Sequence, residues 1–470
     1  MKSMHISHRT LILAMLSTTL LGGCASFSQD GGFGPVETAT QTHLQKTVVW
    51  TRDEAARSAV TQRVERLLAH PLTVDDAVQI ALLNNPGLQA AFNTLGIAEA
   101  DWVAAQRLPN PGVSLGRMTR GSEIEWERSL HFNLAMLLSM PMRAEIEQRL
   151  FEQTRHALVL DVLKLAADTR KAWIAAVAAG QTVAYQQQAM EAAEAGAELA
   201  RRMAAAGNWS VLQRAREQSF YADAALAVVR ARQAEHVARE RLVRLMGLTA
   251  ADTLRLPDRL PPLPATPTVL EEVEQRAMDT RIDLQLARLQ TEALATHLGL
   301  TRRTRFINVL ELGLSHNRSN EEPTQRGYEI SFELPLFDFG QGRVRQAEAR
   351  YRQALERVRE IAVNARSEVR EAYAMQQSQY AIARHVRDEI VPLKQRISEE
   401  NVLRYNGMLI GVFELLADAR SQIAAVNAAI EAQRDFWLAD ADLAMALVGT
   451  PAKTPVIQVS TTPAEAGGGH

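Results

Sequence analysis

Hydrophobic residues follow two different spacings along this chain, and the change between them separates the predicted elements. Thr73 and Asp76, which precede an apolar run, predict the capped start of a helix that ends before Pro86. A second helix is expected from Pro86 to about Arg107. Beyond it the hydrophobic period falls from 3.6 to 2 residues, which is typical of β-strands.

Alternating polar and apolar residues predict two β-hairpins. From Glu127 to Met140 the even positions are mostly apolar and the odd positions mostly polar, and residues 306–315 and 328–334 alternate in the same way. Each hairpin should therefore have one apolar and one polar face. The polar face is expected to carry Glu127, Ser129, His131, Asn133, Glu311, Glu329 and Glu333.

A long stretch suited to helix follows the first hairpin. Residues 142–256 contain no proline and are rich in Ala, Leu, Arg, Glu and Gln, all of which favour helix. About 60 residues before a break at Gly207-Asn208 would form a helix of about 90 Å. A helix of about 38 residues should then return antiparallel to it.

The whole pattern occurs twice, at a separation of about 197 residues. The second long stretch, 342–447, should turn at Asn406-Gly407 and kink at Pro392. The sequence then divides into a signal peptide (1–23), a lipid anchor, tether and periplasmic N-terminal segment (24–70), a first repeat (71–256), a linker (257–267), a second repeat (268–450) and a disordered C-terminal tail (451–470).

Composition supports long helices and excludes several kinds of function. Hydrophobic residues make up 47% of the chain but aromatic residues only 5%, and Ala dominates the apolar set, as in closely packed helices. The formal net charge of −2 gives no global field for binding nucleic acid. The 11 histidines are scattered, and no hydrolase, zinc-protease or phosphate-loop motif occurs. We expect no enzyme and no cofactor or metal site.

The N-terminus has the features of an export signal. Basic residues precede an apolar run that ends at Gly23 and is too short to cross about 30 Å of hydrocarbon. The run ends in Leu-Gly-Gly-Cys, which resembles a bacterial lipobox, so the only cysteine, Cys24, should be acylated as the first mature residue. Ala25 in place of an inner-membrane retention Asp favours the outer membrane. The polar, glycine-bearing residues from Ala25 to about Thr42 predict a flexible tether.

Four strands in one chain cannot close a barrel, because membrane-spanning barrels begin at about eight strands. An open sheet with an apolar outer face would aggregate. The chain must therefore assemble, and a lumen wide enough for solutes favours twelve strands from three copies over eight from two. A half-buried sheet of a soluble protein alternates in the same way, but it would not explain the lipobox, the repeat or the long helices.

These features together resemble the TolC-type outer-membrane efflux proteins. The match covers about residues 70–450 and includes Leu-Pro-Asn-Pro at 108–111 and Leu-Pro-Leu-Phe-Asp at 334–338. The resemblance implies a mainly helical fold and a homotrimer whose twelve strands form one barrel in outer-membrane lipid. It also implies a hollow α-barrel in the periplasm that meets an adaptor protein and an inner-membrane pump of the RND type, so that solutes pass to the exterior.

In such a channel the turns between the long helices are candidates for the gate. We expect the turns at Gly207-Asn208 and Asn406-Gly407, where glycine can take the positive φ that a tight turn needs. Charged residues near the turns would line the gate, although ordinary ion pairs between helices explain them equally well: Arg214, Arg216, Glu414, Asp418 and Arg420.

Two other functions remain open, a periplasmic adaptor and a structural coiled-coil lipoprotein. An adaptor carries one helical hairpin within lipoyl-like domains, whereas this chain has two hairpins and membrane-type strands. A structural lipoprotein would not need a polar strand face. The sequence does not identify the exported solute.

Overall fold

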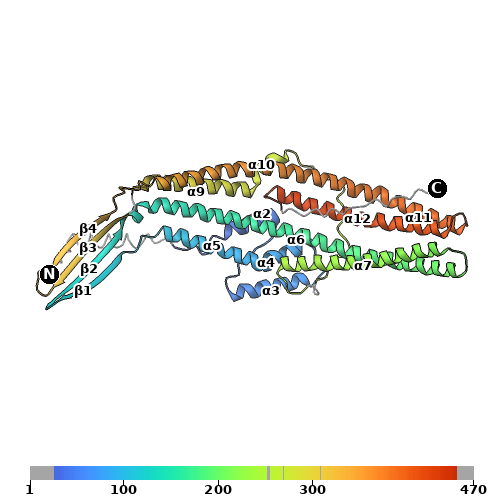
Figure 1. The fold of residues 1–470 in the computed structure, drawn as a ribbon, viewed down its shortest axis with the longest axis horizontal. Coiled ribbons are helices and arrows are strands. Elements are labelled where there is room, and N and C mark those ends of the chain that lie inside the picture. Colours follow the sequence, from blue (N-terminus) through green and yellow to red (C-terminus); the bar gives the residue numbers. More distant parts are fainter. Residues whose placement is uncertain (1–25, 251–253, 268, 307–308, 452–470) are drawn as a thin grey trace, which may run out of the picture.

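The computed structural model describes residues 26–250, 254–267, 269–306 and 309–451, which form one elongated molecule (Figure 1). A β-sheet occupies one end, and two long helical stretches run from it to the other end, where each turns back into a shorter helix that reaches about the middle of the molecule. The remaining helices lie along the middle and the sheet-proximal part of the long ones. Cys24, the signal peptide and all but the first residue of the predicted tail lie outside the described residues.

Helix, helix, strand, strand and a long helical pair follow one another twice along the chain. Two N-terminal helices come first, α2 (Gly34–Leu44) and α3 (Glu54–Leu68). The first set is α4 (Val74–Asn84), α5 (Pro86–Ala105), β1 (Gly112–Arg120), β2 (Glu123–Asn133), α6 (Leu134–Ala205) and α7 (Val211–Met246). The second set is α8 (Val273–Thr280), α9 (Ile282–Thr304), β3 (Leu310–Ser319), β4 (Gln325–Phe332), α10 (Gln341–His385), the π-helical turn η1 (Val386–Ile390), α11 (Val391–Asn406) and α12 (Val412–Ala446).

The four strands form one antiparallel sheet in the order β1-β2-β3-β4. Its central pair, β2 and β3, joins the two sets of elements, and Leu130 faces Leu314 in this pair. β1 and β4 are edge strands, with no further strand beside them among the described residues. The sheet is therefore open on both sides within one chain.

β2 ends at Asn133, and the prediction that the strand continues to Met140 is wrong. The side chain of Asn133 accepts a hydrogen bond from the N–H of Met136 at 2.8 Å and caps α6. Residues 134–140 are mostly Leu, Ala and Met, which are strong helix formers, so the local preference overrides the alternation. α6 then continues through Pro141 for 72 residues, about 108 Å.

Pro392 interrupts the second long helix, as expected. The five residues of η1 form a π-helical turn directly before α11, and Pro392 lies in the first turn of α11. Proline has no N–H and its ring crowds the carbonyl four residues earlier. The wider π turn accommodates both effects without breaking the helix. No helix among the described residues combines the length and apolar character of a membrane span.

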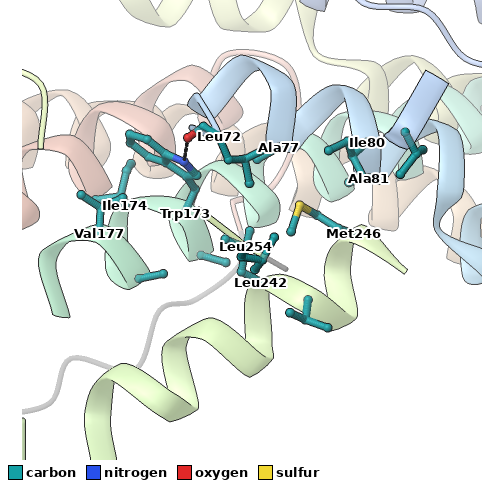
Figure 2. Packing of buried hydrophobic residues seen from close by; sticks show 14 of the residues in the cluster. Leu72, Ala77, Ile80, Ala81, Trp173, Ile174, Val177, Leu242, Met246 and Leu254 are labelled. Atoms are coloured by element: carbon teal, nitrogen blue, oxygen red, sulfur yellow. Dashed lines mark hydrogen bonds between the residues drawn. The ribbon is translucent and has the colours of Figure 1, made fainter. Parts of the chain in front are cut away.

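The core lies where α4, α6 and α7 meet (Figure 2). Trp173 of α6 is 3% exposed and donates a hydrogen bond from its indole N–H to the carbonyl of Leu72 at 2.9 Å. Leu242 and Met246 of α7 close the cluster from the other side and are fully buried. These contacts fix the start of the first set against its long helical pair.

Polar side chains attach the end of each long pair to the start of the same set. The amide of Asn84 donates to the carbonyls of Met246 and Gly247, at 3.0 and 2.9 Å. Arg281, which is 1% exposed, takes the corresponding place in the second set and donates to the carbonyl of Ala446 at 3.3 Å. The carboxylates of Asp283 and Glu368, 2.5 and 2.8 Å away, balance its charge.

Residues 31–40 pack on the core, whereas residues 26–30 are exposed, so the predicted flexible tether over residues 25–42 is wrong from residue 31 onward. Phe33 is 5% exposed and meets Phe92 edge-on with ring centroids 4.8 Å apart. Val36 is fully buried. Phe33 and Val36 have helical spacing, but the polar and glycine-rich composition around them favoured a tether in the prediction. Gly31 and Gly32 supply positive φ angles in the turn before α2.

The linker of residues 257–267 is also fixed to the helices. Leu260 and Leu263 are buried, and the indole N–H of Trp437 donates to the carbonyl of Pro261 at 3.1 Å. The hydroxyl of Tyr380 donates to the carbonyl of Pro264 at 3.0 Å. The crossing between the two sets is thus held by buried leucines and by hydrogen bonds to its carbonyls.

Replacing Gly247 by alanine should lower the thermal unfolding midpoint more than the same change at Gly207. Both glycines have a positive φ, +67° and +77°, which costs roughly 1–2 kcal/mol in an L-residue. A Cβ at Gly247 would also lie 2.5 Å from the carbonyl oxygen of Asn84, whereas Gly207 faces open space. Circular dichroism of both variants in detergent tests this, and equal midpoints would contradict the contact.

Candidate functional site: the sheet faces and the helical tips

One face of the sheet is acidic. Residues directly paired across antiparallel strands lie on the same side, so register and alternation place five predicted polar residues on one face: Glu127, Ser129, His131, Glu311 and Glu329. Asn133 also lies on this side at the end of β2. Glu333 lies just beyond β4, and its N–H bonds to the carbonyl of Val309 at 3.4 Å.

The same face carries two carboxylates that the sequence prediction missed, Glu123 and Glu125 of β2. Extending the alternation from Glu127 toward the N-terminus would have found them. Within the four strands, Arg120 is the only Lys or Arg on this side. We call this side the acidic face; its carboxylates are Glu123, Glu125, Glu127, Glu311 and Glu329.

A hydrogen-bonded chain of small polar groups lies near the helical end of the acidic face. His131 Nε2 is 2.7 Å from Ser129 Oγ, which in turn bonds to the hydroxyl of Ser114. Gly313 pairs with His131, and a Cβ there would lie 3.3 Å from the imidazole Nδ1. The glycine thus leaves room for the ring. Nowhere in the described chain do three or more His, Cys, Asp or Glu gather as metal ligands.

The opposite face is apolar near the helices, and its side chains are exposed. Val113 is 67% exposed, Tyr328 77% and Phe332 63%. Exposed apolar residues continue from β4 into the following loop, where Phe337 is 98% exposed. A soluble single chain rarely exposes a contiguous apolar surface of this kind, so this face requires a cover.

The two helical tips lie at the end of the molecule far from the sheet (Figure 1). Gly207 turns the first pair with φ +77°, as predicted. The corresponding prediction for Gly407 is wrong, because its φ is −80° and Met408 takes the left-handed conformation instead, with φ +59°. A hydrogen bond of 2.8 Å from the N–H of Leu409 to the carbonyl of Arg404 closes this turn.

The predicted gate residues divide into an exposed and a partly buried group. Arg214, Arg216 and Glu414 are exposed. Arg420 is half-buried and forms an ion pair of 2.6 Å with Glu217, a residue the sequence prediction missed. Nothing in the pattern distinguishes Glu217 from the other acidic residues of α7; only the packing of α12 against it does so.

Some buried polar atoms around the Glu217–Arg420 pair have no hydrogen-bond partner among the described residues. Glu217 is 1% exposed, and the Arg420 guanidinium lies 4.3 Å from the ring centroid of Phe220. One carboxylate oxygen of Asp418 is buried with no hydrogen-bond partner among the described residues. Glu198 lies at a partly exposed position near the end of α6. Hydrogen bonds from Arg201 and Arg202 lower the pKa of its carboxyl to about 2.

Comparison with known proteins identifies the fold. No protein-family model matches the chain. Over 288 residues it is 24% identical to the cobalt-zinc-cadmium resistance protein CzcC of Cupriavidus metallidurans, covering 60% of this chain and 67% of that protein. The fold is similar to that of the outer-membrane channel CmeC of Campylobacter jejuni (TM-score 0.69, 16% identity, 80% of this chain and 85% of the other). It is also similar to the open state of the outer-membrane channel MtrE of Neisseria gonorrhoeae (TM-score 0.66, 18% identity, 80% and 89%).

These similarities confirm that the fold resembles that of outer-membrane channels. The fold is mainly helical and is that of such channels. The identity to each solved structure is low, so the similarity concerns the arrangement of elements and not individual site residues.

Replacing Arg420 by alanine should loosen the helices at the tips. Glu217 would then be buried without its cation, which lowers the free energy of local opening. We expect a loss of about 1–3 kcal/mol. The loss is no larger because the Arg420 side chain is itself 30% exposed. Amide hydrogen exchange in α7 and α12 measures this. Adding Glu217→Gln should restore part of the protection, and Arg214→Ala should leave exchange unchanged. Exchange that is the same in Arg420→Ala and wild type would exclude a stabilising pair.

Proposed function

We propose that the chain is the outer-membrane channel of a tripartite efflux or secretion system. The observation that carries this proposal is the sheet, which has an exposed apolar face, an acidic face and two unpaired edges. Each property suits a wall segment of a water-filled membrane barrel. The length of α6, about 108 Å, suits a duct that crosses the periplasm, and the similarity to outer-membrane channels supports the same function.

Three copies of the chain would complete the structure. Twelve strands would form one barrel in outer-membrane lipid, with the acidic face toward the lumen and the apolar face toward lipid. Each chain would add two helical pairs, one from each repeat, to a hollow α-barrel below it. The two sets of elements support this arrangement because each supplies two strands and one long pair.

The helical tips would meet a periplasmic adaptor and, through it, an inner-membrane pump of the RND type. Apolar side chains at both tips are exposed and would be covered in such a contact; Val211 is 75% and Met408 93% exposed. An adaptor or a structural lipoprotein is the alternative function for a chain rich in long helices. Neither accounts for the exposed apolar face of the sheet. We propose no enzymatic step, because the proteins with this fold are channels.

Cations are the solutes that the acidic face fits best. Five carboxylates per chain project from this side of the strands, with Arg120 as the only Lys or Arg among them. Repetition in three copies would give the lumen a strongly negative potential, which concentrates cations. His131 could contact a passing metal cation. The name of the relative CzcC, a cobalt-zinc-cadmium resistance protein, supports the same class of solute.

Mass spectrometry tests both the trimer and the lipid anchor. Native mass spectra of the protein extracted in mild detergent should show three copies, because four strands cannot close a barrel. Intact mass should correspond to a chain that starts at Cys24 and carries acyl groups. A stable monomer would contradict the barrel, and an unmodified chain starting elsewhere would contradict the anchor.

The channel should be cation-selective in planar bilayers. Glu127→Gln combined with Glu329→Gln should shift the reversal potential in a KCl gradient toward zero, because six carboxylates would leave the trimeric lumen. Glu65→Gln on α3, an exposed acid away from the sheet, serves as the matched control. An unchanged reversal potential in the double variant would show that the acidic face does not line the conducting path.

The helical tips should close the resting channel. We propose that charged groups near the turns also pair between neighbouring copies, where an exposed pair is worth about 0.2–1 kcal/mol and, repeated in three copies, can bias a two-state closure. Asp418→Ala combined with Arg420→Ala should therefore raise single-channel conductance without loss of the trimer. Arg357→Ala, at an exposed position of α10, is the control. If conductance stays at the wild-type level while assembly is intact, closure depends on other residues or on the adaptor.

A further inference from the structure

The face opposite the acidic face changes character along the strands. The register defines rows that run across the sheet. The three rows nearest the helices are apolar: Leu310 and Phe332, then Phe132, Leu312 and Ile330, then Val113, Leu130, Leu314 and Tyr328. The next two rows, toward the hairpin turns, hold most of the positive charge: Leu115, Arg128, His316 and Arg326, then Arg117, Trp126 and Arg318.

We call Arg117, Arg128, His316, Arg318 and Arg326 the basic band. Its four arginines are exposed, and none forms an ion pair with a carboxylate of the described residues. Arg117 lies over the ring of Trp126 at 5.7 Å. Every carboxylate of the strands lies on the opposite side of the sheet, so the band has no internal counter-charge.

We propose that the basic band binds the phosphate groups of lipids in the outer leaflet of the outer membrane. This inference rests on the proposed function, which turns this face toward lipid. The apolar rows would then lie in the hydrocarbon, and the band would lie at the end of the sheet away from the periplasmic helices (Figure 1). Lipid headgroups are the groups found at that level of a membrane.

The chemistry of the band fits phosphate. Arginine presents several N–H donors in a planar fork that matches phosphate oxygens. Arg128 and Arg326 stand two strands apart in one row, about 10 Å, so one headgroup with several phosphates can contact both. Trp126 lies within the band and Tyr328 in the row beside it, and aromatic residues are enriched at membrane interfaces. An acidic protein would have to enter the plane of the membrane to reach the same arginines.

Lipid retention by the full-length protein tests this proposal. Wild type and the triple variant Arg128→Gln, Arg318→Gln and Arg326→Gln are reconstituted in phosphatidylcholine with bis-phosphorylated lipid A or with its dephosphorylated form. After extraction in mild detergent, the retained lipid is measured by mass spectrometry. Wild type should retain the phosphorylated form preferentially, and the triple variant should retain at least about tenfold less. Arg120→Gln, on the acidic face, should behave as wild type.

Conductance of the same preparations separates this inference from the proposed function. If wild type conducts but retains both forms of lipid A equally, the basic band does not bind phosphate and the channel function stands. If wild type forms no channel at all, the proposed function fails and this inference fails with it. If the triple variant does not assemble, two other measurements test the proposal. Wild type should still retain the phosphorylated form preferentially, and the single variant Arg326→Gln should retain less of it. Retention that follows the phosphate but is unchanged by every arginine variant would place the lipid elsewhere.

Discussion

The unpaired edges of the four-stranded sheet are the constraint on which the rest of the structure depends. β1 and β4 each present a row of backbone N–H and C=O groups without a partner strand among the described residues. Such groups must be satisfied inside a membrane, where water is absent. In the channel proposed above, a sheet of this size would meet that requirement by pairing with other copies, so its edges would dictate assembly. The exposed apolar face imposes the same condition independently.

Pairing of β2 with β3 transmits this constraint to the helices. The two strands belong to different sets of elements, so both sets must start their long helices at the same level. Asn133 begins α6 at the last residue of its strand, whereas a loop precedes α10. A π turn directly precedes the helix turn that holds Pro392, and the polar contacts of Asn84 and Arg281 fix the returning helices.

Charge is divided between the two faces of the sheet by the parity of the strands. Carboxylates occupy one side, and arginines the distal part of the other. Because successive residues point to opposite faces, a slip of one residue in register would exchange them. The pairs His131 with Gly313 and Ser114 with Ser129 help to fix the register through close contacts that only this alignment provides.

The sequence by itself determined the elements and most of the acidic face. Thr73, Gly207 and the alternation through Glu127 and Glu311 act through neighbours close in the chain, so spacing alone reveals them. Two local outcomes differed from the prediction: residues 134–140 alternate like a strand but form helix, as their helix propensity favours, and Met408 takes the conformation expected of Gly407. Tertiary structure alone decided contacts between distant segments, such as the packing of Phe33 and the pairing of Glu217 with Arg420. Such contacts depend on which helix faces lie together, and no local pattern encodes that choice.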